Sequence, residues 1–274
     1  MAMIVGEADD VPRVATKRTP RGLAFRRGVL SIFIGIVAWE LIGRFVLKGG
    51  LLFAPFSEVI VVLCRSVASG DIWQHLQVST AEFLLGFGAA IIVGMAVGVL
   101  MGRSKVAYDY LDPWVSILYS SPLVALMPFY LLLFGVGLLS KVAIVYTVSI
   151  FPIVLNTYTG IRSTDRNLLE VARSFSCSEM QIFSKIQFPS SLPFVLTGIR
   201  LGLGRALTGV VVGELFSSQA GVGYLIATAG QTFDAATVLM GVLIFTLAGL
   251  GLMTFLDWLG DYLAPWRSTI DGDR

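Results

Sequence analysis

The sequence contains very little charge. Of its 274 residues, 14% are Asp, Glu, Lys or Arg, whereas soluble domains carry about 25%. Apolar residues make up 55% of the chain, and the mean hydropathy is +0.81. Because apolar runs of about 20 residues recur along the chain, this composition predicts a membrane protein.

Cysteine and histidine are also scarce, which excludes several kinds of site. The two cysteines, Cys64 and Cys177, form no CxxC pair, so neither a disulfide framework nor a metal site is expected. The single histidine, His75, precedes an apolar run and is expected to be an ordinary exposed residue. A net charge of +2 is too small to indicate nucleic acid as a partner.

The sequence also lacks a nucleotide-binding loop. No glycine is followed by lysine, so the GxxxxGK[ST] pattern that cradles phosphates does not occur. We therefore expect a chain that is not an enzyme and that holds no cofactor.

Six apolar runs predict an all-α membrane protein with six transmembrane helices in one domain, residues 29–260. The expected spans are residues 29–47, 83–101, 113–135, 141–161, 193–215 and 236–259. Residues 1–28 are polar, basic and broken by prolines, and are expected to be a disordered arm. Residues 261–274 are expected to be a tail.

Two segments outside the spans have patterns of their own. The stretch SEVIVVLCRSVAS, between the first two spans, predicts an amphipathic helix lying along the membrane surface. Residues 216–235 are polar and rich in glycine, and predict a loop or a short re-entrant piece.

The basic residues predict the orientation. With the N-terminus inside, the cytoplasmic segments hold fourteen of the Lys and Arg residues and the external segments hold three. This bias follows the positive-inside rule and places both termini in the cytoplasm, Cys64 outside and Cys177 inside.

Small residues in the second span predict close helix packing. Gly86, Ala90, Gly94, Gly98 and Gly102 recur every four residues and form one smooth stripe. Such stripes let helix backbones approach each other in lipid, so we expect a seam within the subunit or with a second copy. In the third span, three prolines predict a kinked helix that lines a cavity: Pro113, Pro122 and Pro128.

A polar stretch at about residues 162–192, between the fourth and fifth spans, is too elaborate for a simple connector. Thr164 or Asp165 can cap a first short helix, and Ser178 with Gln181 forms a capping-box pattern that opens a second one. Prolines at 189 and 193 are expected to end the second helix. The result is a corner at residues 176–178 that projects into the cytoplasm.

This stretch resembles the EAA loop of binding-protein-dependent ABC transporter permeases. In the family pattern, Glu-Ala-Ala is followed after three residues by Gly and, nine residues later, by Ile-x-Leu-Pro. Glu170, Ala172, Ile186 and Pro189 match it, whereas Ser176 replaces the glycine. Because serine incurs a steric cost at positive φ, we expect this corner to avoid that conformation.

The resemblance covers roughly residues 50–260 and is strongest to nitrate-, sulfonate- and taurine-type importers of the bacterial inner membrane. It implies a permease that pairs with a second copy or a close relative, receives substrate from an external binding protein, and couples to a cytoplasmic ATPase dimer. ATP and Mg²⁺ would then be bound by that ATPase, and lipid would surround the spans. The resemblance assigns the coupling contact to Glu170, Ala172, Arg173, Phe175, Ser176, Cys177, Ser178, Ile186 and Pro189.

Charged residues inside the spans are further candidates. Glu40 and Arg44 are four residues apart and are expected to pair along one helical face. Arg200 is expected to be architectural. Arg205 falls near mid-membrane, where it either faces a pathway for an anionic substrate, together with Ser120 and Ser121, or bonds to backbone carbonyls or Glu214.

Two other classes of membrane protein, an intramembrane serine protease and an ion-coupled carrier, have less support in the sequence. An intramembrane serine protease needs a serine and a histidine together inside the membrane, and His75 lies outside the expected spans. An ion-coupled carrier usually has internal repeats and several membrane-embedded acids. Glu40 is the only acid expected well inside a span, so a carrier is the second choice.

Overall fold

The computed structural model describes residues 21–46, 53–217 and 219–263, and the secondary-structure elements in this part of the chain are all helices. Five helices are long and apolar enough to cross a membrane, and a sharply bent pair makes a sixth crossing if its halves are one span. The elements are α1 (Arg21–Leu41), η1 (Ile42–Val46), α2 (Phe56–Ser69), α3 (Asp71–Arg103), α4 (Lys105–Ser120), η2 (Leu123–Leu126), α5 (Met127–Phe134), α6 (Leu138–Arg162), α7 (Arg166–Ser174), α8 (Glu179–Ile182), η3 (Phe183–Gln187), α9 (Phe188–Ser217), α10 (Val222–Gln231) and α11 (Ala235–Leu263).

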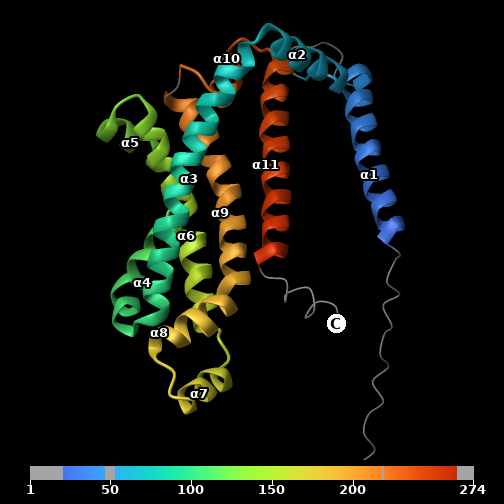
Figure 1. Ribbon diagram of the computed structural model, residues 1–274. Helices are drawn as coiled ribbons and strands as arrows, with labels where there is room; N and C mark the ends of the chain where they lie inside the picture. The colour runs from blue at the N-terminus through green and yellow to red at the C-terminus, as the bar shows by residue number, and fades with distance from the viewer. Residues whose placement is uncertain (1–20, 47–52, 218, 264–274) are drawn as a thin grey trace, which may run out of the picture.

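Helix α6 is the centre of the bundle and packs between α3 and α9 (Figure 1). The glycine stripe of α3 faces α6, as expected for a seam within the subunit. A Cβ added at Gly86 would lie 2.6 Å from Val145 Cβ, and one at Gly98 would lie 2.6 Å from Thr157 Cβ. Glycine therefore brings the two backbones close enough for van der Waals packing, which is the main source of helix association in lipid.

Helix α9 uses small residues in the same way on the other side of α6. A Cβ at Gly202 would lie 3.0 Å from the Ser149 carbonyl oxygen, and one at Gly198 would lie 2.8 Å from Asn156 Cβ. These α9 glycines were not recognised from the sequence as a seam. They complete a three-helix core of α3, α6 and α9.

Helix α1 stands apart from this core and is joined to it through α2, which crosses the top of the molecule in Figure 1. Only 6% of the residues in its most apolar stretch are buried. The helix begins at Arg21, so residues 21–28 are not the disordered arm that we expected; residues 1–20 lie outside the described part. A spanning helix can extend into water on polar turns, and hydropathy does not detect such an extension.

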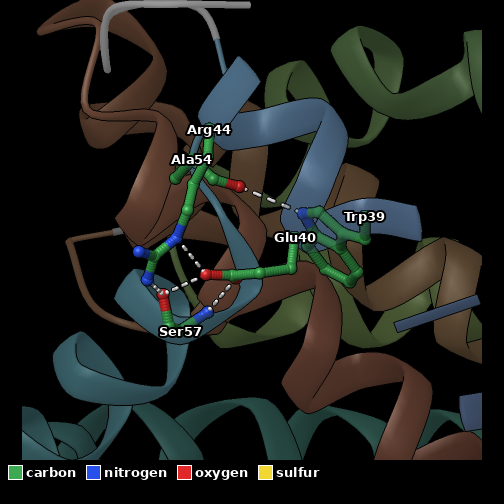
Figure 2. A network of polar contacts seen from close by, with 5 residues as sticks. All are labelled: Trp39, Glu40, Arg44, Ala54 and Ser57. Atoms are coloured by element: carbon green, nitrogen blue, oxygen red, sulfur yellow. Dashed lines mark hydrogen bonds and ion pairs between the residues drawn. The ribbon is translucent and has the colours of Figure 1, made fainter. Parts of the chain in front are cut away.

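Figure 2 shows the polar network that fixes the junction of α1 and α2. Arg44 Nε donates to Glu40 Oε1 at 2.5 Å, which confirms the expected pair. The same carboxylate accepts the Ser57 backbone N–H at 2.9 Å and the Ser57 hydroxyl at 2.9 Å. Glu40 thus satisfies a free N–H in the first turn of α2, where a negative charge is favourable. Trp39 Nε1 adds a bond to the Ala54 carbonyl at 3.0 Å.

The expected third span is not one kinked helix. α4 ends at Ser120, η2 and α5 follow, and the two halves meet at 88°. Pro122 has no N–H to donate and keeps the preceding residue out of the helical region, and Ser121 accordingly has ψ 150°. Pro113 lies within α4 and Pro128 begins α5, so only Pro122 breaks the segment.

Three other boundaries differ from expectation. α3 begins at Asp71, twelve residues before the expected second span. The segment 216–235 contains a helix, α10. α11 continues to Leu263, and residues 264–274 lie outside the described part. For α3 and α11, an apolar-run criterion reports only membrane-embedded length, whereas the helix continues wherever its backbone stays hydrogen-bonded.

The two ends of the bundle have different elements. In Figure 1, the first described turn of α1, the last turn of α11 and the α7–α8 segment all point to the lower end, and α2 and α10 lie at the upper end. The described ends of the chain therefore share a side with α7 and α8.

Candidate functional site

Two short helices, α7 and α8, form a corner at the lower end of the bundle. The Asp165 side chain accepts the Asn167 N–H at 2.8 Å and caps α7. Ser178 and Gln181 form the expected capping box: the Gln181 N–H donates to Ser178 Oγ at 3.3 Å, and the Ser178 N–H donates to Gln181 Oε1 at 2.8 Å. Both N-terminal signals in the sequence are confirmed.

The turn between the two helices is a Schellman motif. The Cys177 N–H donates to the Ala172 carbonyl at 3.1 Å, and the Ser176 N–H donates to the Arg173 carbonyl at 2.8 Å. Ser176 has φ +55°, so the expectation that serine would keep this corner out of positive φ is wrong. The left-handed residue costs about 1–2 kcal/mol, which the two bonds to otherwise free helix carbonyls offset.

The corner presents an apolar ring to solvent. Phe175, the last residue before the turn, is 79% exposed. Glu170 is exposed, as are Arg173 and Ser178, whereas Cys177 is half-buried. Phe175 is thus an exposed apolar side chain on a polar, doubly capped segment.

The remaining residues assigned to this loop lie inward of the corner. Ala172 is buried, and Ile186 and Pro189 are half-buried. The prolines do not end the second helix: α8 passes through the π-helical turn η3 directly into α9. A wider π turn redirects a helix without ending it, so the corner is continuous with a spanning helix.

A second contact ties this segment to α3. The Arg103 guanidinium, at the end of α3, lies 4.6 Å from the centroid of the Phe183 ring in η3. Ile182, next to that ring, is buried. The segment therefore contacts α3 as well as continuing into α9.

The break between α4 and η2 opens a cavity of about 230 Å³. Its lining comes from four elements: Tyr119, Ser121, Pro122, Leu123, Val124, Val148, Arg205 and Thr208. Two of the three pathway candidates, Arg205 and Ser121, thus meet at one cavity. The third, Ser120, does not line it, and its hydroxyl donates to the Ser116 carbonyl at 2.8 Å.

Arg205 is the only charged residue of that lining. In the described part of the chain no carboxylate lies within ion-pair distance of it, whereas Arg200 pairs with Asp257 on α11. Glu214, the alternative partner considered for Arg205, is bonded elsewhere. A larger cavity of about 390 Å³ between α3, α9 and α11 has no charged side chain in its lining.

Known proteins identify this architecture. Residues 90–269 match the family described as binding-protein-dependent transport system inner membrane component. The chain belongs to this family. It is a multi-span permease of the ABC importer family, and the bacterial inner membrane is its location.

Individual relatives cover between 68% and 90% of this chain. The aliphatic sulfonates transport permease protein SsuC of Bacillus subtilis (strain 168), named as putative for that role, is 36% identical over 90% of this chain and 89% of its own length. The taurine transport system permease protein TauC of Escherichia coli K12 is 27% identical over 89% of this chain and 90% of its own. The nitrate import permease protein NrtB of Synechocystis is 30% identical over 68% of each chain.

The fold also matches a solved structure. An inward-facing form of the MetNI methionine ABC transporter superposes with a TM-score of 0.58 and covers 72% of this permease and 97% of that chain. At 18% sequence identity, this likeness establishes the fold alone.

A buried polar cluster at the upper end of the permease was missed by the sequence. Glu82 is fully buried and ion-paired with Lys141, which is buried near the start of α6. Glu214 is 1% exposed and accepts the Ser79 hydroxyl at 2.5 Å and the Gly223 N–H at 2.5 Å. Glu82 on α3 and Glu214 on α9 are thus two buried acids on helices long enough to cross a membrane.

The same cluster holds the start of α10. The Gly221 N–H donates to His75 Nδ1 at 2.9 Å, and the Val222 N–H donates to Ser79 Oγ at 2.9 Å. His75 is therefore not the ordinary exposed residue that we expected: it caps another helix. A polar residue at the edge of an apolar run was the only signal in the sequence, and it does not specify a partner.

Proposed function

We propose that this permease couples ATP hydrolysis by a separate cytoplasmic ATPase dimer to the import of a small anion. The α7–α8 corner docks on the ATPase, and closure of the ATPase moves the corner and, through η3, helix α9. The spans then alternate between outward and inward access. ATP and Mg²⁺ are bound by the partner, and this chain performs no catalysis.

The exposed Phe175 ring carries this proposal. The ring is fixed by a capped turn, is continuous with a spanning helix and lies at the same end as the described ends of the chain. The fourteen-to-three distribution of basic residues supports a cytoplasmic position for that end.

The other partners follow from the same arrangement. A second copy of the permease completes the central pathway, and an external binding protein delivers substrate at the end that carries α2 and α10. The relatives are named for sulfonates, taurine and nitrate, which are all small and bear oxyanion groups. We infer a substrate of that kind for this permease.

The coupling contact is tested by Phe175→Asp. The substitution places a charge in a dry protein–protein contact, and burial of an unpaired charge costs several kcal/mol. We expect the variant to insert normally, to lose co-purifying ATPase and to lose uptake. Ser176→Gly, which removes the side chain at the left-handed position, should retain both.

The matched control is Val136→Asp, which places the same charge on an apolar residue that is 74% exposed and lies between α5 and α6. It should leave the ATPase bound. If the Phe175→Asp permease purified with its ATPase and imported substrate normally, the coupling proposal would be wrong.

A further inference from the structure

We propose that the cavity at the α4–η2 break is a transient binding site for the substrate anion, with Arg205 holding the charged group. This inference rests on the proposed function and specifies where in the pathway the solute is held. It rests on three observations: a broken helix, a cation without an ionic partner in the described part of the chain, and a cavity lining that contains both polar and apolar residues.

The broken helix leaves non-helical backbone at residues 121 and 122, which is unfavourable in contact with lipid. Non-helical backbone at membrane depth is tolerated only where protein buries it or where it lines a water-filled cavity. At this break the Ser121 hydroxyl donates to the Ile117 carbonyl at 2.9 Å, which satisfies one carbonyl of the last turn of α4. Ser121 and Pro122, the two residues of the break, line the cavity.

Arg205 enters the same cavity from near the middle of α9. Its side chain is exposed, and a guanidinium exposed to hydrocarbon costs about 3 kcal/mol on insertion scales and more in simulations. Two other cations of the core helices, Arg200 and Lys141, each pair with an acid on a neighbouring helix. Arg205 has no such acid in the described part of the chain, so a pathway that carries an anion accounts for its charge.

The lining selects the class of anion. A guanidinium forms two parallel bonds to a carboxylate, sulfonate or nitrate group, and Tyr119 and Thr208, two residues that carry hydroxyls, belong to the same lining. The same lining also contains three apolar side chains, Leu123, Val124 and Val148. At about 230 Å³ the cavity is smaller than the 300–1,000 Å³ of drug-sized pockets. The site thus suits an oxyanion with a short apolar tail.

The experiment uses the purified permease–ATPase complex without its binding protein. The probes are 1-butanesulfonate and the uncharged butyl methyl sulfone, and the readout is the melting temperature of the complex as a function of probe concentration. We expect the sulfonate to raise the melting temperature saturably and the sulfone to leave it unchanged. Absence of a sulfonate effect on the wild-type complex would overturn the inference.

Two variants test the assignment to Arg205. Arg205→Gln should raise the half-saturating sulfonate concentration about ten- to hundredfold, because it removes charge-assisted hydrogen bonds. Val124→Phe should weaken binding by filling the cavity while leaving Arg205 in place. Arg200→Gln, which removes a cation from the same helix, should bind the sulfonate as the wild type does.

Each outcome decides the question. Wild-type affinity in either Arg205→Gln or Val124→Phe would show that the anion binds elsewhere. If Arg205→Gln prevents assembly, the Val124→Phe result decides alone: weakened binding supports the site and unchanged binding refutes it. ATPase retention is scored in the same preparations, so failure of the coupling proposal is seen separately from failure of this one.

Discussion

Gly221 shows how one residue can determine the position of a whole helix. It has φ +127°, a region that residues with a side chain rarely adopt, and a Cβ there would collide with the Glu214 carboxylate. Its own N–H is bonded to His75. The absence of a side chain therefore lets the start of α10 approach the buried acid.

We predict that Gly221→Ala destabilises the permease. Backbone strain of this kind costs about 1–3 kcal/mol, and the added methyl would also displace the Glu214 carboxylate from its bonds. The melting temperature of the purified complex should fall by several degrees. Gly230→Ala is the matched control, since nothing lies within 4 Å of a Cβ at that position of α10; it should be neutral or slightly stabilising. Equal melting temperatures for the two variants would contradict this account.

At the scale of elements, the α3–α6 seam is the main determinant of the bundle. A continuous stripe of small residues on α3 meets branched side chains of α6 at four-residue intervals, from Val145 to Ile161. Helix α6 therefore lies inside the bundle: 56% of the residues in its most apolar stretch are buried, compared with 11% for α11. The seam therefore fixes the position of the helix that also supports α9 and the cavity.

We predict that Gly98→Ala separates these helices locally. The new methyl would lie 2.6 Å from Thr157 Cβ and 2.7 Å from the Val154 carbonyl oxygen, and backbone cannot move aside cheaply. Overpacking of this kind costs about 1–3 kcal/mol. Thermal unfolding of the complex should begin several degrees lower. Gly88→Ala, on the same helix with nothing within 4 Å, should unfold with the wild type; a loss as large as that of Gly98→Ala would show that the seam is not the cause.

At the scale of the whole molecule, the two cysteines lie on elements at opposite ends of the bundle. Cys64 is exposed on α2, and Cys177 is half-buried at the corner between α7 and α8. Figure 1 shows these elements at the upper and lower ends. A single orientation in the membrane therefore exposes one thiol to each side.

We predict that a membrane-impermeant maleimide labels Cys64 in spheroplasts and labels Cys177 only in inverted vesicles. The basic residues concentrate on the side of α7, which the positive-inside rule places in the cytoplasm. Cys64→Ser and Cys177→Ser variants identify which thiol has reacted. Labelling of Cys177 in intact spheroplasts would reverse the orientation and remove the coupling corner from the cytoplasm.

The sequence by itself determined the features that depend on local chemistry. Apolar length identified most of the spanning helices, the stripe on α3 identified a seam, and hydrogen-bonding side chains identified the capped starts of α7 and α8. Glu40 and Arg44 were paired correctly because a helix brings residues four apart onto one face. The spacing around Glu170 and Pro189 indicated the family, which the comparisons confirm.

Only the tertiary structure decided which distant groups meet. The sequence gives no sign that His75 and Ser79 of α3 and Glu214 of α9 would hold the start of α10, because partners from separate elements have no fixed spacing along the chain. The sequence predicted a kink where the helix breaks at Pro122, and it predicted that Ser176 would avoid positive φ. The second prediction was wrong because hydrogen bonds at the turn, which local propensity does not include, stabilise the left-handed residue. Arg205 could be placed at mid-span from its position alone, but its cavity exists only because α4, η2, α6 and α9 come together around the break.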